Sequence, residues 1–294
     1  MTKISKIIGR QVFDSRGNPT VEAEIFSDDG FKSSSIVPSG ASTGTHEAFE
    51  LRDKENQNYL GKSVLGATNN INKIISKSLK NFDVFDQGKI DKTLIDLDGT
   101  EQKSRLGANS ILAVSIAANK LGAVCKNISQ FKYLGGSTAN QLPLPLMNII
   151  NGGAHANNSL RIQEFMIRPE NPKKFSEAIR MCFLVIQNLK NHISKKKLST
   201  TVGDEGGFAP SLDKNEDAIE LILESIEKSG FKSGKDISIC LDVASNELHK
   251  DGKYSVQSSQ LDKIESTIDY YLNLINQYPI KSIEDLLVTD IFSK

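Results

Sequence analysis

The sequence predicts an α+β N-terminal cap domain over residues 1–138, followed over residues 139–294 by an incomplete α/β barrel of the TIM type. In the first part, strand patterns come before helical patterns, which is the order of an α+β domain. In the second part, short apolar strands alternate with helices, and two of these strands end in carboxylates, as in barrels whose reactive groups lie at strand ends. The second part is shorter than the roughly 250 residues of a complete barrel, so we expect only some of its strands.

The N-terminal part begins with a hairpin. Apolar and polar residues alternate over residues 21–25, which predicts a half-buried strand. Asp28, Asp29 and Gly30 predict a turn, and Phe31 begins the return strand. Helical patterns follow over about 61–80, about 87–96 and about 108–124. The last of these is apolar on most faces, which predicts a buried helix.

A linker is predicted near residues 136–143, "GSTANQLP", because this stretch is small, polar and rich in proline at its end. Beyond it the strand signals are "LPLPLMNII", "EFMIRP", "DISICLDVAS" and "PIKSIED". Helices are predicted between them over roughly 173–195, 214–229 and 259–276. Strands that alternate with helices predict a parallel sheet with crossover helices.

Composition excludes several classes of protein. The formal net charge is zero, so there is no electrostatic case for binding nucleic acid or an anionic membrane. No run reaches the roughly 18 apolar residues of a membrane span, and the N-terminus lacks the apolar core of a signal peptide. The three cysteines, Cys125, Cys182 and Cys240, are few and far apart, so we expect free thiols in a reducing cytoplasm.

Two carboxylates end neighbouring predicted strands. Asp242 closes "CLD" and Glu284 closes "SIE", with one helical pattern between them. Adjacent strands would bring both groups to one rim, where a divalent cation would relieve their repulsion, and Mg²⁺ prefers such oxygen ligands. The spacing alone slightly favours the alternative, two acids that cap helices or pair with lysines.

Residues 201–210, "TVGDEGGFAP", place Asp204 and Glu205 in a glycine-flanked turn. Gly206 and Gly207 let the backbone approach a ligand closely. A carboxyl group held in such a turn can lose water and gain the raised pKa of a general acid. An acidic surface turn is the plainer alternative.

A third group of candidates surrounds "INGGAHANN" and "IQEFMIRP". His155 follows a Gly-Gly turn, and histidine can contact phosphate or transfer protons. Gln163 and Glu164 lead into the next strand, and Glu164 is a candidate partner of the acid at 205, since paired carboxyl groups push one pKa upward. A lone histidine in a loop is more often an ordinary surface residue.

The small, polar loop in "VPSGASTGTHEAFELRD", residues 37–53, could close over a phosphate or supply an oxygen to a metal. It lacks the lysine of a Walker loop. A flexible exit from the hairpin is the alternative.

Nine short motifs follow one another along the chain: "DSRGNPTVE", "PSGASTG", "ELRD", "DLDGT", "GANSILAVS", "MNIINGGAHANN", "QEFMIRP", "VGDEGGFAP" and "SIED". Their order resembles enolase, the phosphopyruvate hydratase of glycolysis. The resemblance extends from residue 1 to about 285, and it does not extend to the mandelate racemase branch of the superfamily, which has a Lys-x-Lys pair where this chain has "QEFMIRP".

The resemblance implies a reaction and a set of roles. Enolases reversibly dehydrate 2-phosphoglycerate to phosphoenolpyruvate with Mg²⁺, and they usually dimerise with a contribution from the first domain. Glu205 matches the acid that protonates the leaving hydroxyl, and Glu164 matches the glutamate that assists it. The remaining matches are Gln163 and His155 as substrate contacts, Asp242 and Glu284 as ligands of the first metal, and Ser42 as the loop serine that closes on the second.

The sequence departs from the family after Glu284. "SIEDLLVTD" resembles one family motif joined to the tail of the next, as a deletion near residue 285 would produce. The family's lysine base, its third metal ligand and its "SHRSGE" segment do not occur in the 294 residues. The alternatives to an active enolase are therefore a non-catalytic remnant, an interaction subunit of a full-length enolase, or one half of a split enzyme.

Overall fold

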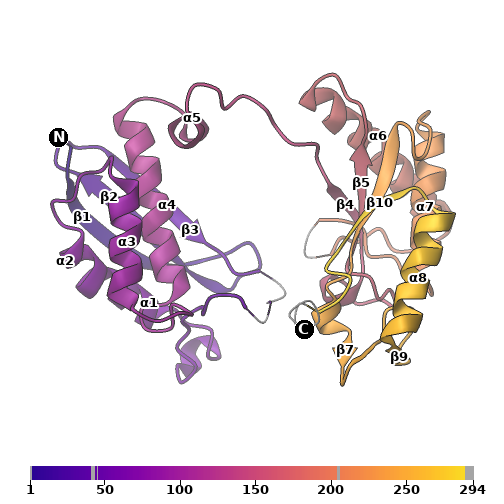
Figure 1. The fold of residues 1–294 in the computed structure, drawn as a ribbon, viewed down its shortest axis with the longest axis horizontal. Helices are drawn as coiled ribbons and strands as arrows, with labels where there is room; N and C mark the ends of the chain where they lie inside the picture. The colour runs from indigo at the N-terminus through magenta and orange to yellow at the C-terminus, as the bar shows by residue number, and fades with distance from the viewer. Residues whose placement is uncertain (1, 41–43, 45, 204–205, 289–294) are drawn as a thin grey trace. The chain divides into compact units, whose positions relative to one another are not determined.

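The computed structural model describes residues 2–40, 44, 46–203 and 206–288. The chain divides into two compact units, Met1–Gln141 and Leu142–Lys294, and each is described by itself (Figure 1).

The N-terminal unit is a three-stranded antiparallel sheet with helices packed on one face (Figure 1). Successive side chains of the central strand point to opposite faces of the sheet. Val21, Ala23 and Ile25 point to the helices and are fully buried, so this apolar face is the one that the helices cover. The sheet is ordered β1 (Ile4–Phe13), β2 (Pro19–Ser27) and β3 (Lys32–Val37). The helical elements are η1 (Gln57–Tyr59), α1 (Leu65–Asn70), η2 (Ile71–Ile75), α2 (Ser76–Ser78), α3 (Gln87–Asp98), α4 (Ala108–Cys125) and α5 (Gln130–Gly135).

Helix α4 is the central helix of this unit. Its alanine-rich face packs on β2 and β3, and Ala113, Ala117 and Leu121 have no exposed surface. Among the described helices it alone has the length and hydropathy of a membrane span, but 56% of that window is buried inside the unit, as in the core helix of a folded domain. The prediction of a buried helix over 108–124 is confirmed.

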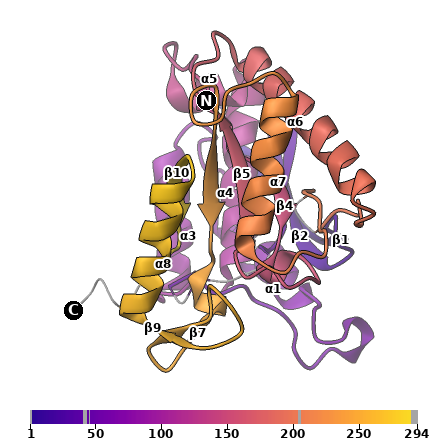
Figure 2. The same ribbon diagram turned by 90° about the vertical axis from the view of Figure 1, so that its right-hand side faces the viewer.

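The C-terminal unit is built on a four-stranded sheet with the order β10-β6-β5-β4. Helices α6, α7 and α8 lie along one face of it (Figure 2). The strands are β4 (Met147–Asn151), β5 (Glu164–Pro169), β6 (Ile237–Asp242) and β10 (Ile280–Glu284). The helices are α6 (Phe175–Lys195), α7 (Asn215–Lys228) and α8 (Ile264–Gln277). Short elements complete the unit: η3 (Gly153–His155), η4 (Ser245–Glu247) and a small sheet of β7 (His249–Lys250), β8 (Lys253–Tyr254) and β9 (Asp262–Lys263).

The prediction of an all-parallel sheet is wrong for two of the three strand pairs. β4 with β5, and β5 with β6, are antiparallel, and only β6 with β10 is parallel. The reason is the number of helices in each connection. β4 and β5 are joined without a long helix, and α6 and α7 form a helical hairpin that returns the chain to the end of the sheet where β5 finished. The single long helix α8 carries the chain back along the sheet, so β10 starts beside the start of β6.

The outer edge of β4 is covered by Phe208, which itself pairs with Val202. The N–H of Asn151 donates to the carbonyl of Phe208 at 2.8 Å, and the N–H of Phe208 donates to the carbonyl of Ile149 at 2.9 Å. Phe208 packs into the core of this unit and is 8% exposed. The glycine-rich turn of the sequence is thereby fixed to the strand end that precedes Gly152.

Candidate functional site

One end of the four-stranded sheet carries a row of polar side chains, which we call the strand-end row. Each of the four strands contributes one residue from its end, and each residue is paired in register with the next across the sheet. In sheet order these residues are Asn151, Glu164, Asp242 and Glu284. Directly paired residues project from the same face of a sheet with their Cβ atoms about 5 Å apart. The structure therefore places three carboxylates next to one another, Glu164, Asp242 and Glu284, at the rim where the sequence predicted two.

The electrostatic environment of Asp242 is unfavourable for its charge. Burial raises the pKa of Asp242, and the negative charges of Glu284 and Asp285 raise it further. A hydrogen bond from the N–H of Ala244 at 3.1 Å and the proximity of His155 act in the opposite direction, but they do not cancel the effect of burial. A half-buried carboxylate that is compensated so little is typical of a ligand-binding position.

The backbone after β6 is strained where it directs an N–H at Asp242. Ala244 has φ 49° and ψ 54°, the left-handed conformation that alanine rarely adopts. The turn is held by neighbouring bonds, because the N–H groups of Val243 and Ser245 donate to the carbonyls of Glu284 and Asp285, each at 3.1 Å. The ends of β6 and β10 are therefore tied together beyond the last strand residues.

His155, Gln163 and Glu164 lie at the same end of the sheet. Nδ1 of His155 is 3.4 Å from Oε1 of Glu164, and the His155 residue is 6% exposed. The backbone of Gln163 is fixed on both sides, since its N–H donates to the carbonyl of Asp242 and its carbonyl accepts from Gly152. Its side-chain Oε1 is buried and accepts no hydrogen bond from the described residues. Such an atom is available for a bound ligand.

Glu205 lies outside the described residues, and the described glycines on either side of it, Gly203 and Gly207, are held by hydrogen bonds. The N–H of Gly203 donates to the carbonyl of Gly207 at 2.8 Å, and the Asn151 side-chain amide donates to the same carbonyl at 2.6 Å. A Cβ on Gly203 would lie 2.5 Å from the carbonyl oxygen of His155, and one on Gly207 would lie 3.0 Å from the Asn151 amide. Both glycines are needed because the turn approaches β4 and the His155 backbone so closely.

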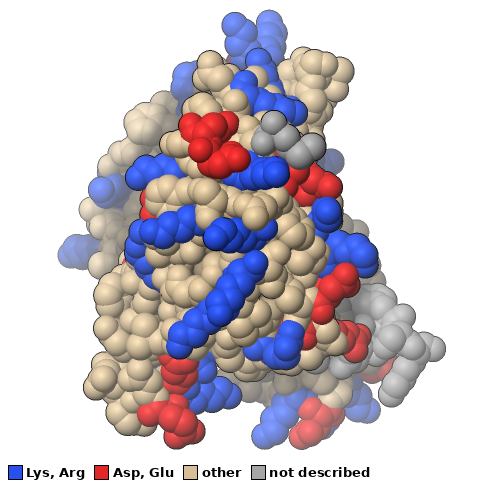
Figure 3. All heavy atoms as spheres, turned by 90° about the vertical axis from the view of Figure 1, so that its left-hand side faces the viewer, with Lys and Arg blue, Asp and Glu red and all other residues tan. Residues whose placement is uncertain are grey.

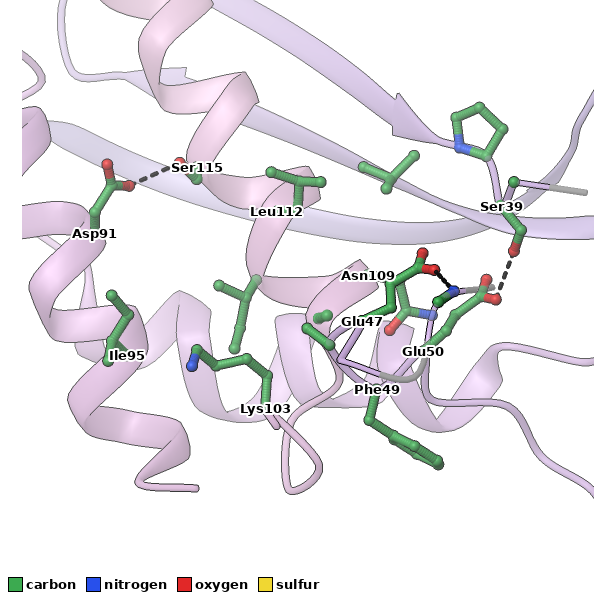
Figure 4. A pocket seen from close by; sticks show the side chains of 17 residues that line it. Ser39, Glu47, Phe49, Glu50, Asp91, Ile95, Lys103, Asn109, Leu112 and Ser115 are labelled. Atoms are coloured by element: carbon green, nitrogen blue, oxygen red, sulfur yellow. Dashed lines mark hydrogen bonds between the residues drawn. The ribbon is translucent and has the colours of Figure 1, made fainter. Parts of the chain in front are cut away.

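Ser42 also lies outside the described residues. The residues beside its loop border a hollow of about 740 Å³ that belongs to the N-terminal unit alone (Figure 4). α3 and α4 form its other wall, where the Ser115 hydroxyl donates to Asp91 at 2.7 Å. At the loop, Ser39 donates to Glu50 (Figure 4). Apolar side chains such as Ile95 and Leu112 and polar ones such as Asp91 and Lys103 line the hollow together, and none of the carboxylates of the strand-end row lines it.

Both halves of the chain match a family model. The model described as "Enolase, N-terminal domain" matches residues 4–134, and that described as "Enolase, C-terminal TIM barrel domain" matches residues 139–294. An enolase of Pelagibacter ubique (strain HTCC1062) is 61% identical over 285 residues, which are 97% of this chain and 68% of the relative. The chain belongs to the enolase family. By this resemblance it is a lyase of the phosphopyruvate hydratase class, with the predicted α+β domain followed by part of a TIM barrel.

The carboxylates of the strand-end row meet only some of the requirements of a site for a hard divalent cation. Asp242 and Glu284 are paired oxygen donors, and the proximity of His155 does not offset the effect of burial on the pKa of Asp242. Among the described residues no three His, Cys, Asp or Glu side chains are grouped closely enough to hold one ion. The described part of the site therefore offers Asp242 and Glu284 as candidate oxygen donors, without a third ligand beside them.

Sequence reasoning missed Asn151 as a residue of this site. The side chain is fully buried, accepts a hydrogen bond from the Asn148 amide at 2.6 Å, and anchors the turn of Gly207. The available signal was its position, because it ends an apolar strand just as Asp242 and Glu284 do.

Proposed function

We propose that this chain binds Mg²⁺ and 2-phosphoglycerate at the strand-end row and forms part of an enolase that reversibly dehydrates 2-phosphoglycerate to phosphoenolpyruvate in glycolysis. The observation that carries the proposal is the register of Glu164, Asp242 and Glu284, which brings three carboxylates to one end of the sheet. Family membership supports the same reaction class.

Asp242 and Glu284 would hold the metal through their carboxylate oxygens. When bound, Mg²⁺ neutralises the negative charge that develops on the substrate carboxylate as the C2 proton leaves. The raised pKa of Asp242, which burial and the charges of Glu284 and Asp285 produce, fits this role because a cation would favour its ionised form.

The proton-transfer groups are Glu164 and, by resemblance, Glu205. Oε1 of Glu164 lies 3.4 Å from Nδ1 of His155, within ion-pair distance of a protonated imidazole, and the role of Glu164 would be to assist the acid that protonates the departing hydroxyl. The buried amide of Gln163 has an acceptor atom available to orient the substrate.

The lysine segment that the resemblance gives as the source of the C2 base has no counterpart within residues 1–294. Loss of a positioned base costs about 10²–10⁴-fold in rate. We therefore expect the chain by itself to bind substrate but to turn it over slowly. The open edge of β10, which has a partner on one side only in the described part of the chain, favours a second role as an interaction subunit that pairs with the rest of a barrel.

We also propose a cytoplasmic homodimer formed through the N-terminal unit. The face of its sheet opposite its own helices carries an ion-pair network in which Arg10 contacts Glu22 at 3.1 Å and Glu24 at 2.6 Å. Apolar Ile36 is 48% exposed beside it. Basic and acidic side chains both occur on the face drawn in Figure 3, with uncharged surface between them. The free thiols of the three cysteines fit a reducing compartment.

Calorimetric titration of the purified chain with 2-phosphoglycerate in the presence of Mg²⁺ tests the proposed function. We expect binding that weakens at least tenfold in Asp242→Asn and is unchanged in Asp269→Asn, an exposed acid on α8. Phosphoenolpyruvate absorbance in the same samples reports turnover. Equal binding by wild type and Asp242→Asn, or no binding by wild type, would contradict the proposal.

A further inference from the structure

We propose that Asn215, the first residue of α7, is a positioning residue for Gln163 and Glu164. It acts through the backbone that leads into β5. This inference rests on the proposed function, in which Gln163 orients the substrate and Glu164 assists the acid.

The Asn215 side chain is buried and hydrogen-bonded through both of its polar atoms. The residue is 2% exposed. Its Oδ1 accepts from the N–H of Arg161 at 3.0 Å and from the N–H of Ile162 at 3.2 Å. Its Nδ2 donates to the carbonyl of Val256 at 2.9 Å and to the Tyr270 hydroxyl at 3.2 Å. The two backbone N–H groups can only donate, so they determine which half of the amide carries the oxygen.

The acceptor half of this amide holds the two residues that precede Gln163 and Glu164. Strand β5 begins at Glu164, so the N–H groups of Arg161 and Ile162 lie outside the strand. A buried N–H group needs an acceptor, and Oδ1 of Asn215 serves both groups. Because only two soft dihedrals per residue follow the Ile162 peptide, fixing that peptide restricts the direction of the Gln163 side chain.

A second set of contacts limits the same segment. The N–H of Gly152, in the turn that leads to His155, donates to the carbonyl of Gln163 at 2.9 Å. A Cβ on Gly152 would collide with the carbonyl oxygen of Ile162, so the turn and the segment are in close contact. The segment is thus held by the Gly152 turn and by Asn215.

The donor half of the amide connects this segment to the loop that follows β6. Val256, the acceptor of Nδ2, is 1% exposed. Beside it, the Arg161 side chain donates to the Ser255 carbonyl at 2.8 Å and to the Ser255 hydroxyl at 2.7 Å. The two halves of the Asn215 amide therefore have separable roles. The oxygen positions the segment before Gln163, and the nitrogen holds the loop after β6.

Amide hydrogen exchange of the full 294-residue chain, followed by nuclear magnetic resonance without Mg²⁺ or substrate, tests this assignment. The N–H of Gln163 donates to the carbonyl of Asp242, and the N–H of Ile239 donates to that of Pro279. The ratio of the Gln163 exchange rate to the Ile239 exchange rate separates local opening from opening of the whole unit. We expect this ratio to rise at least tenfold in Asn215→Ala.

Two variants separate the halves of the amide. The matched control is Tyr270→Phe, which removes a hydrogen bond of Nδ2 and leaves Oδ1 intact, so its exchange ratio should equal that of the wild type. Asn215→Asp is the conservative variant, because its carboxylate keeps an acceptor for Arg161 and Ile162. Its ratio should stay within threefold of the wild type even where its thermal midpoint falls.

Calorimetric titration with 2-phosphoglycerate and Mg²⁺ should follow the same order. We expect affinity to weaken at least tenfold in Asn215→Ala and less than threefold in Asn215→Asp and Tyr270→Phe. A purely structural role would instead make affinity follow the thermal midpoint in all three variants.

Each outcome has a defined meaning. Exchange that accelerates equally at Gln163 and Ile239 in Asn215→Ala overturns the proposal in favour of a structural role alone. If Asn215→Ala shows no cooperative thermal transition, Asn215→Asp decides, and a tenfold rise of its ratio overturns the proposal. The expected exchange ratios without 2-phosphoglycerate binding by the wild type would contradict the proposed function and leave the positioning of Gln163 standing. Wild-type binding that Asn215→Ala leaves unchanged would contradict the positioning role alone.

Discussion

Two aspartates, one in each unit, occupy opposite environments at the ends of secondary-structure elements. Asp98 ends helix α3 in the N-terminal unit, and Asp242 ends strand β6 in the C-terminal unit. Asp98 is buried and Asp242 is half-buried. They differ in the number of hydrogen bonds that each carboxylate accepts.

Asp98 is 2% exposed and is surrounded by donors. Burial by itself would raise its pKa, but hydrogen bonds from the Thr100 hydroxyl and from the backbone amides of Leu106 and Thr100 outweigh it, so the pKa of Asp98 is lowered. Its carboxylate ties the end of α3 to the loop that leads into α4. It is a structural carboxylate.

Asp242 accepts one backbone hydrogen bond, from Ala244, and lies beside the negative charges of Glu284 and Asp285. The comparison indicates that burial alone does not identify a functional carboxylate. A structural carboxylate has a complete set of donors within the fold, whereas a ligand-binding carboxylate lacks part of that set.

The largest effect should come from removing the structural carboxylate. Asp98→Ala leaves the buried N–H of Leu106 without its acceptor, so we expect a loss of about 3 kcal/mol in the free energy of unfolding of the N-terminal unit. Urea unfolding followed by far-ultraviolet circular dichroism measures it. The control is Asp96→Ala on the same helix, whose exposed ion pair with Lys92 should contribute less than about 0.5 kcal/mol. Similar losses in both variants would contradict the distinction.

The second effect is the stabilisation that a cation bound at Asp242 would give to the C-terminal unit. Mg²⁺ at one hundred times its dissociation constant should stabilise the C-terminal unit by about 2.7 kcal/mol, because it binds the folded state alone. Thermal unfolding with and without Mg²⁺ measures this, and Asp242→Asn should abolish the response while Asp98→Asn retains it. A response that persists in Asp242→Asn would place the ion elsewhere.

The third effect is a pH dependence of opposite sign at the two sites. The lowered pKa of Asp98 stabilises the fold above the ordinary aspartate pKa of about 3.9, and this contribution is lost as pH falls through the folded-state value. The raised pKa of Asp242 favours the folded state at low pH, and this contribution is lost as pH rises through its folded-state value. Without Mg²⁺ at neutral pH, Asp242→Asn should therefore be slightly more stable than wild type, by less than about 1 kcal/mol. Stability curves from pH 3 to pH 8 for both Asn variants check the two signs.

The sequence predicts much of this arrangement, and particular residues mark where it does not. Asp242 and Glu284 were expected on adjacent strands because one helical pattern separates them, and they are directly paired. The direction of β5 was not predicted, although two helices, α6 and α7, were expected before β6. An even number of long helices returns the chain to the same end of a sheet, and hydrophobic periodicity reports the elements without that geometry.

Glu164 joins the same row for a reason that the sequence conceals. Because β5 is antiparallel to β6, the first residue of β5 lies beside the last residue of β6. A rule that looks for reactive groups only at the carboxyl ends of strands would place Glu164 at the wrong end. Three-dimensional register, and not position along a strand, decides which acids meet.

The smallest effect concerns the strained turn that supplies the one backbone donor to Asp242. Ala244→Gly should relieve the left-handed conformation, but the greater entropy of glycine in the unfolded chain offsets the gain, so stability should change by no more than about 1 kcal/mol. The N–H to Asp242 remains, and Mg²⁺ should stabilise this variant as it does the wild type. Ala244→Val is the matched opposite, because a β-branched residue is poorly tolerated at φ 49°. We expect Ala244→Val to lose stability and the Mg²⁺ response together while Ala244→Gly loses neither. That result would indicate that the left-handed backbone at residue 244 positions this N–H to donate to the carboxylate that binds the cation.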